Sequence, residues 1–378
     1  MTGPNRIITF LGESRYGTIR DRLRPQVDAF ARHGFTVEFV DMLQPDAPVP
    51  TGRDVAFYFC PQGWRPPALG SAPVLALFGD HPVYHIDRLT TLPKGAVAAF
   101  PTPLSAAFAR RFFLHVAVAC VPPAVDVAPP EADVDKDIDL LFVGSYWNHR
   151  EYRPPKQAHE LVQRHFKNAM AALKADPRAD VFTPVMTEFI TLAQQRNGTP
   201  GQAARVLSMG SGTCIAIDRC YRGWLRDTVI RDLSRANVHL IGEGWDHALR
   251  GVKGRFTFHG EQPYGEIARF YARSKLCLNI FPAYHDYHER IFDITAGGSL
   301  AMTQATPALR ERFSFTDDIA PLDLNGHRLR TTVQDLLADR DRLADRADNA
   351  RRIVGDSFSV DGRVDRFLGL AREQGWIN

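Results

Sequence analysis

The chain has 378 residues, enough for about two domains, and its hydrophobic content of 44% can supply ordinary globular cores. Its formal net charge is only +3, without a long basic block, so the sequence does not favour nucleic-acid binding. No apolar run approaches the roughly 18 residues that a membrane helix needs. Five scattered cysteines without a CxxC pair, and an N-terminus without a signal sequence, are typical of a cytoplasmic protein with reduced thiols and no metal site.

The first third of the chain alternates apolar strands with amphipathic helices. Continuous apolar runs are typical of parallel strands that are covered on both faces. They predict six strands, at Ile7–Leu11, Phe35–Val40, Val55–Cys60, Val74–Gly79, Val97–Phe100 and Val116–Val121. Gly12 and Glu13 follow the first strand in a turn that lacks the GxGxxG spacing of a dinucleotide site. For these two residues, a plain turn and a contact with a ligand are equally open.

Polar residues that can carry chemistry follow the fourth of these strands. Asp80 and His81 come directly after it, and His85 and Asp87 lie a few residues further on. Side chains at the carboxyl end of a parallel strand face the crevice above the sheet. A histidine beside a carboxylate can be tuned for proton transfer or can hold a substrate hydroxyl. We therefore expect Asp80 and His81 to be catalytic, with helix capping by Asp80 as the alternative.

A helix predicted at Pro103–Phe113 ends in two arginines and two phenylalanines. Arg110 and Arg111, beside Phe112 and Phe113, could touch an anionic membrane surface or a lipid-linked substrate. The more ordinary role of such a pair is to cover the exposed side of a core helix. We expect at most a peripheral contact with membranes.

The chain divides at a proline-rich, acidic segment. Residues 1–124 form the first predicted domain, and the segment 125–137 has the composition of a linker. The second domain is expected over 138–357, with a helical insertion at about 152–215. A last helix within 358–378 could pack back on the first domain.

The second domain repeats the alternation of strands and helices. Strands are predicted at Ile138–Gly144, Val238–Gly242, Phe256–His259, Lys275–Phe281 and Ser299–Thr303. The helices expected among and after them are Tyr221–Arg235, Gly265–Arg273, His288–Ala296 and a single charged helix at about Arg330–Val354.

The stretch Lys275–Thr303 has the pattern strand, loop, helix and strand. Its helix is stopped by Gly297 and Gly298, as glycine does at a helix C-terminus. A loop at the carboxyl end of a strand, opening a helix, is where an anionic ligand is expected. His288 and Arg290 stand at the start of this helix and could add donors and positive charge.

Four segments in the second half stand in the order and spacing of a known group. They are Val238–Trp245 (VHLIGEGW), Tyr264–Asn279, Arg290–Gly298 and Leu309–Phe313. Over about Ile138–Leu370 the sequence resembles the C-terminal domain of GT-B glycosyltransferases of the group-1 type, in particular their CgeB-like branch. In the N-terminal half only the architecture matches. The resemblance implies an α/β fold of two Rossmann-like, doubly wound domains facing a central cleft, the first of them on the acceptor side.

The resemblance also implies roles for residues of the second domain. In that family an acidic residue on the helix holds the ribose of the donor, and Asp293 stands at its place. The commoner motif has two glutamates separated by seven residues, and His285 stands where the first would be. The donor-binding residues implied are Gly144, Ser145, Glu243, Gly244, Trp245, Tyr264, His285, His288, Arg290, Asp293, Gly297 and Gly298.

The resulting hypothesis is a glycosyltransferase that moves a sugar from a UDP-, GDP- or dTDP-sugar to an acceptor. The family implies a retaining reaction without a metal, and no further cofactor is expected. The acceptor could be a glycan, a lipid-linked molecule or a protein, and the sequence leaves the oligomeric state open. Two alternatives are a degenerate protein that only binds nucleotide sugars or assists assembly, and a dinucleotide-dependent oxidoreductase, which the missing GxGxxG disfavours.

Overall fold

A computed structural model describes residues 5–12, 18–44, 48–52, 54–66, 69, 72–127, 134–195, 200–283, 286–324 and 326–378, without the side chains of 18, 200, 201, 203 and 326. The chain forms two compact units. Unit 1 comprises Met1–Ala128, Pro263–Gly265 and Val354–Asn378, and unit 2 comprises Pro129–Gln262 and Glu266–Ile353.

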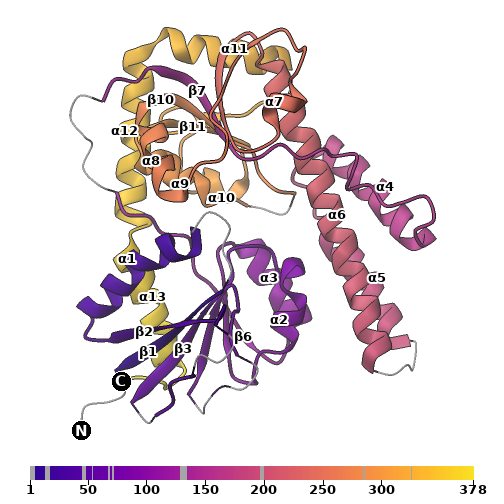
Figure 1. Ribbon diagram of the computed structural model, residues 1–378, viewed down its shortest axis with the longest axis vertical. Coiled ribbons are helices and arrows are strands. Elements are labelled where there is room, and N and C mark those ends of the chain that lie inside the picture. The colour runs from indigo at the N-terminus through magenta and orange to yellow at the C-terminus, as the bar shows by residue number, and fades with distance from the viewer. Residues whose placement is uncertain are drawn as a thin grey trace. The chain divides into compact units, whose positions relative to one another are not determined.

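Unit 1 is built on a parallel sheet of six strands in the order β2-β1-β3-β4-β5-β6 (Figure 1). The strands are β1 (Arg6–Leu11), β2 (Thr36–Asp41), β3 (Val55–Pro61), β4 (Val74–Leu77), β5 (Val97–Phe100) and β6 (Ala117–Cys120). The helices between them are α1 (Thr18–Arg32), the short 3₁₀ turn η2 (Pro82–Tyr84), α2 (Ile86–Thr90) and α3 (Pro103–Phe112). Every residue of β3, β4 and β5 is buried, which explains why these strands have continuous apolar sequences. The six predicted strands are confirmed.

The helix at the end of the chain, α13 (Val360–Glu373), belongs to unit 1. Its apolar face contributes Val364 and Phe367 to the core of this unit, together with residues of β1 and β3. The ring of Phe367 lies 5.3 Å from that of Phe59 and 6.4 Å from that of Phe30. Burial of a phenylalanine side chain contributes about 2 kcal/mol, so several such contacts hold the helix on the sheet.

Unit 2 contains a second parallel sheet of six strands, in the order β12-β11-β10-β7-β8-β9. The strands are β7 (Ile138–Val143), β8 (Asn237–Ile241), β9 (Arg255–Phe258), β10 (Ser274–Asn279), β11 (Leu300–Thr303) and β12 (Ala320–Pro321). The first five were predicted from the sequence. The sixth was not, because two residues leave no apolar pattern to read. Both sheets are parallel and carry helices, which confirms the α/β class.

Three helices between β7 and β8 form the arm of unit 2: α4 (Glu160–Ala175), α5 (Phe182–Gln195) and α6 (Pro200–Asp232) (Figure 1). The expectation of an insertion that ends near residue 215, followed by a separate helix at Tyr221–Arg235, is wrong, because α6 is continuous over 33 residues. Two of its glycines allow close packing instead of ending the helix. A Cβ on Gly210 would lie 2.9 Å from Phe189 on α5, and one on Gly223 would lie 2.6 Å from the carbonyl oxygen of Trp147.

The remaining helices, most of whose residues belong to unit 2, are α7 (Trp245–Ala248), α8 (Tyr264–Arg273), α9 (Arg290–Ala296), α10 (Pro307–Arg310), α11 (Gly326–Ala338) and α12 (Arg340–Ser357). The single helix expected at Arg330–Val354 is wrong. Asp339 divides it, because its carboxylate accepts the N–H of Arg342 at 3.1 Å and so caps a new helix. Across the described ranges, no helix is both long and apolar enough to cross a membrane.

Candidate functional site

The loops after β7 and β8 lie against each other at the carboxyl edge of the second sheet. The Gly144 N–H donates to the carbonyl of Ile241 at 2.8 Å, and the Tyr146 N–H donates to that of Glu243, also at 2.8 Å. Gly242 has a φ of +128°, and a Cβ added to it would lie 2.6 Å from the carbonyl carbon of Gly144. Only glycine permits this approach, so the sequence keeps the two loops in backbone contact.

Trp245 holds these loops together from the inside. It is 1% exposed, and its Nε1 donates to the carbonyl of Gly144 at 2.7 Å. The ring of Tyr146 packs edge-on against it at a centroid distance of 5.3 Å. A covered indole cannot stack on a nucleotide base, so Trp245 acts on this edge by positioning the Gly144 loop.

Ser145, Glu243 and Gly244 complete the two loops. The Ser145 hydroxyl accepts the N–H of Glu243 at 3.3 Å, while the side chain of Glu243 is exposed. Gly244 caps α7 with a φ of +80°, a conformation that favours glycine. Of the sequence-predicted donor residues, Gly144, Ser145, Glu243, Gly244 and Trp245 are thus brought together by the structure.

Three charged side chains of α6 face inward near the same edge. Asp218, Arg222 and Arg226 recur at every fourth residue and therefore share one helical face. Their exposures are 0%, 9% and 4%. Asp218 forms an ion pair with Arg222. Arg226 Nη1 donates to the carbonyl of Ser145 at 2.8 Å and so joins α6 to the loop after β7.

Arg226 lies in an environment with surplus positive charge. The guanidinium carbons of Arg222 and Arg226 are each 4.8 Å from the centroid of the Trp147 ring. Burial, followed by the charges of Arg222 and Arg290, lowers the pKa of Arg226 well below its usual range, against the weaker opposing effect of Asp218. Since a guanidinium remains protonated in proteins, this cluster favours the binding of an anion.

The loop between β10 and α9 is tied to α6. Asp218 Oδ1 accepts the N–H of Ala283 at 2.8 Å, and Gln304 Oε1 accepts the N–H of Phe281 at the same distance. Both of these side chains are buried, at 0% and 9% exposure. The loop that leads to α9 is therefore held by buried side-chain acceptors on both sides.

Helix α9 begins at Arg290, two residues after the predicted start. His288 Nδ1 accepts the N–H of Arg290 at 3.1 Å, so this imidazole occupies one of the free donors at the helix start. Arg290 Nη1 is buried and has no hydrogen-bond partner in the part of the chain that the structure describes. Because Arg290 also lowers the pKa of Arg226, its charge adds to the cluster on α6.

Asp293, Gly297 and Gly298 occupy the rest of α9 and its end. Asp293 is half-buried on the helix, three residues after Arg290. A Cβ on Gly297 would lie 2.5 Å from the Cβ of Tyr271, and Gly298 has a φ of +81°. The two glycines therefore have a structural reason, which is close packing on α8 and helix termination.

In unit 1, Asp80 and His81 follow β4 as expected, but the imidazole of His81 faces inward. It is 4% exposed, accepts the Val83 N–H on Nδ1 at 3.3 Å and packs edge-on against Phe108. Burial and the neighbouring His85 lower the pKa of His81 to about 3, so the ring is neutral at neutral pH. Asp80 is half-buried next to it.

Gly12, directly after β1, packs against a tryptophan. A Cβ on Gly12 would lie 2.3 Å from the Trp64 ring, so this glycine is needed for packing. The guanidinium of Arg88 covers the Trp64 ring at 4.0 Å and donates to the carbonyl of Gln62 at 2.8 Å. Gln62 Oε1 in turn accepts the N–H of Gly79 at 3.2 Å, next to Asp80. The residues that directly follow β1, β3 and β4 thus form one connected edge, which comprises Gly12, Gln62, Trp64 and Gly79.

Comparison with known proteins supports a common architecture. Residues 222–369 match the model of a family described as glycosyl transferase-like. The chain is similar to a sucrose-phosphate synthase from Thermosynechococcus elongatus, with a TM-score of 0.57 at 12% identity over 98% of both chains. It is also similar to BGT of phage T4 in complex with UDP-glucose, with a TM-score of 0.56 at 9% identity over 97% of this chain and 99% of that one. HepE from Anabaena, in complex with UDP and glucose, gives 0.54 at 12% identity over 98% and 100%. No curated protein matches the sequence.

The chain has the GT-B glycosyltransferase fold. Two of the expected site residues, Glu13 and His285, lie outside the described residues. Tyr264 is the first residue of α8 and is grouped with unit 1, whereas the rest of the predicted donor residues belong to unit 2. Within the described segments, no group of three or more histidine, cysteine, aspartate or glutamate residues is arranged to hold a metal ion.

The sequence reading missed the charged face of α6. Arg222 and Arg226 fall on the helix predicted at Tyr221–Arg235 without an assigned role, and Asp218 lies outside it, although the repeat of charge at every fourth residue is visible in the sequence. Such a repeat more often marks a solvated face. Packing in the structure separates the two cases, because the Trp147 ring lies against both arginines and its carbonyl oxygen leaves room only for glycine at position 223.

Proposed function

We propose that the chain is a glycosyltransferase that moves a sugar from a nucleotide-sugar donor to an acceptor. The observation that carries the proposal is the buried surplus of positive charge in unit 2. Three guanidinium groups, Arg222, Arg226 and Arg290, gather with the carboxylate of Asp218. A donor diphosphate supplies the negative charge and the hydrogen-bond acceptors that these guanidiniums favour.

The chemistry of the reaction fits this arrangement. When the bond between the sugar and the diphosphate breaks, negative charge develops on the leaving phosphate. Preorganised donors such as Arg226 and the unfilled Nη1 of Arg290 stabilise that charge more in the transition state than in the ground state. We propose that Asp293, three residues along α9, accepts hydrogen bonds from the ribose hydroxyls.

These side chains can perform the charge stabilisation that a metal ion supplies in other phosphate sites. We therefore propose a metal-independent reaction. The proposal also includes membership of the CgeB-like branch and transfer with retention of the anomeric configuration. Transfer that persists in EDTA would support the first point. The anomeric configuration of the product, determined by NMR, decides the last.

On the acceptor side we propose that the carboxylate of Asp80 accepts a hydrogen bond from the hydroxyl group of the acceptor. His81 is neutral and its Nδ1 is taken by Val83, so we assign it to holding the Asp80 loop in place. The chain departs here from the simple expectation of a histidine base. Replacement of Asp80 by asparagine should reduce transfer while leaving donor binding intact, which separates the two units' contributions.

For the donor, we propose a UDP-sugar in the first place. Two proteins of similar fold were solved with UDP-glucose or with UDP and glucose. Thermal-shift measurements with UDP, GDP and dTDP compounds test this choice, because a ligand that binds the folded state raises the melting temperature. The acceptor panel should include duplex DNA beside glycans and lipid-linked sugars, since one protein of similar fold is a DNA-modifying enzyme.

The decisive experiment compares two arginines of the basic cluster, Arg226 on α6 and Arg290 on α9, with an exposed arginine on α6. Arg226→Gln and Arg290→Gln should each weaken nucleotide binding by about tenfold or more, measured by calorimetry, because each removes a charged donor to phosphate. Arg219→Gln, on the exposed side of α6, is the matched control and should bind normally. Undiminished binding by both the Arg226 and the Arg290 variant would contradict the site. Tight binding with no transfer to any acceptor would favour a degenerate, binding-only protein.

A further inference from the structure

The outer face of α3 in unit 1 combines exposed leucines with arginines. Leu104, Ala107 and Arg111 follow one another at spacings of three and four residues, so they lie on one side of the helix. Arg110 is next to them, and Leu114 follows in the turn before β6. We call these five residues the α3 ridge. All five are exposed, Leu104 at 46% and Leu114 at 86%.

The opposite face of α3 is already occupied by packing. Phe108 is 5% exposed and lies 4.6 Å from the ring of Phe112, and Phe113 is 6% exposed. The core of unit 1 therefore does not need Leu104 or Leu114. Leu114 is 86% exposed, so its side chain gains no free energy from burial within this chain. Single apolar residues at lower exposure are ordinary on protein surfaces.

Along the sequence, the charges on both sides of the ridge have one sign. From Arg88 to Val125 the sequence contains three arginines and one lysine and no aspartate or glutamate. Arg110 donates to the carbonyl of Val118 at 3.2 Å, and Arg111 lies over the Phe112 ring. Neither forms an ion pair with any described residue. An anionic surface therefore meets no repulsion from carboxylates in this part of the sequence.

We propose that the α3 ridge docks unit 1 on the surface of a membrane that contains anionic lipids. Leu104 and Leu114 would enter the interface between headgroups and acyl chains, and Arg110 and Arg111 would neutralise lipid phosphates. Two leucines alone give weak binding, and two basic residues alone are screened by salt, so the contact is reversible and needs both. This proposal is independent of the catalytic one, since membrane binding requires neither donor nor acceptor.

The test measures binding of the full chain to sedimenting lipid vesicles. Vesicles of phosphatidylcholine mixed with phosphatidylglycerol should bind the protein about tenfold or more tightly than vesicles of phosphatidylcholine alone, and added salt should weaken this binding. Arg110→Gln with Arg111→Gln should abolish the preference for the anionic vesicles. Leu104→Gln with Leu114→Gln should weaken binding to them without changing the net charge.

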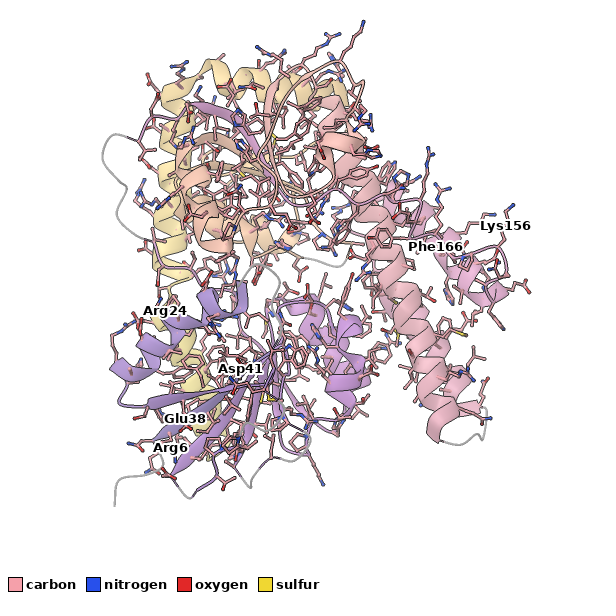
Figure 2. The ribbon with its side chains drawn as sticks, in the orientation of Figure 1. Arg6, Arg24, Glu38, Asp41, Lys156 and Phe166 are labelled. Carbon is pink, nitrogen blue, oxygen red and sulfur yellow. The ribbon has the colours of Figure 1, made fainter. Side chains whose placement is uncertain are left out.

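Two matched controls come from the same unit. Arg20→Gln with Arg24→Gln removes two exposed arginines from α1, where Figure 2 labels Arg24, and Leu43→Gln removes another leucine, exposed at 63%. Both control proteins should bind anionic vesicles like the unmodified chain. Equal binding to the two kinds of vesicle, no binding at all, or equal losses in the ridge and control variants would each overturn the proposal.

Discussion

Asp218 and Ala283 are 65 residues apart in sequence, yet the carboxylate of the first accepts the backbone N–H of the second at 2.8 Å. Through this bond the long helix α6 holds the loop that leads to Arg290. The same carboxylate pairs with Arg222, so one fully buried side chain serves both the backbone and the basic cluster.

Replacement of Asp218 by alanine should destabilise the protein by about 3–5 kcal/mol, because it leaves a buried N–H and a buried guanidinium without their partner. Asp218→Asn keeps an acceptor for Ala283 and should lose less. Denaturant unfolding measures both variants. Asp227→Ala is the matched control, because its pair with Arg231 has the same spacing on the same helix but is solvent-accessible. The control should change stability by about 0.5 kcal/mol or less. Equal losses at both positions would contradict the role of burial.

Gln62 is the one non-glycine residue with a positive φ among the described segments, at 54°. Left-handed backbone costs a residue with a Cβ about 1 kcal/mol, which glycine does not incur. Gln62→Gly and Gln62→Ala both lose the bond to the Gly79 N–H, but only the first relieves the backbone. The glycine variant should therefore be more stable than the alanine variant by about 1 kcal/mol in thermal unfolding.

At an ordinary helical position the order of these two residues is reversed. Arg366→Gly should be less stable than Arg366→Ala by about 1 kcal/mol, because this residue lies in the middle of α13 and its side chain is exposed. If Gln62→Ala were at least as stable as Gln62→Gly, the inference that the backbone at Gln62 is strained would be wrong.

Much of the fold could be predicted from the sequence because it depends on local pattern. Continuous apolar runs such as Val55–Cys60 predicted buried parallel strands, and these are present. The basic cluster could not be predicted in this way, since its energetics depend on burial. The Asp218–Arg222 spacing resembles that of the exposed Asp227–Arg231 pair, and only packing against Trp147 distinguishes the two. The length of α6 was missed because its glycines serve close packing, which sequence alone does not separate from termination.

His85 is a buried imidazole whose two ring nitrogens have no hydrogen-bond partner among the described residues, and its ring packs on Phe78 at 5.0 Å. Burial and then the charge of Arg88 lower its pKa to about 3. Between its unfolded pKa near 6.5 and this value, the unfolded chain binds a proton that the folded one does not, so stability falls as the pH falls, by about 1.4 kcal/mol per pH unit.

His85→Phe keeps the ring packing and removes this proton uptake. Its acid unfolding midpoint, followed by circular dichroism, should move to lower pH, whereas His247→Phe, at an exposed position on α7, should leave it unchanged. An unchanged midpoint for His85→Phe would contradict the assignment.

Lys136 should make the stability of the protein depend on pH in the alkaline range. Its Nζ donates to the carbonyls of Ser274 and Gly298 at 3.0 and 2.5 Å, at the C-terminal end of α9. Burial lowers the pKa of Lys136 from 10.5 to about 8. Between these two values the unfolded chain holds a proton that the folded chain has released, so the amine adds stability as the pH rises through this window. The difference in unfolding free energy between the unmodified chain and Lys136→Met should therefore grow in favour of the unmodified chain from pH 8 to 10.5, by up to about 3 kcal/mol. Lys167→Met, on the exposed side of α4, controls for the loss of a lysine as such. A difference that stays constant across this range would show that the amine of Lys136 is as well solvated in the folded protein as in the unfolded chain.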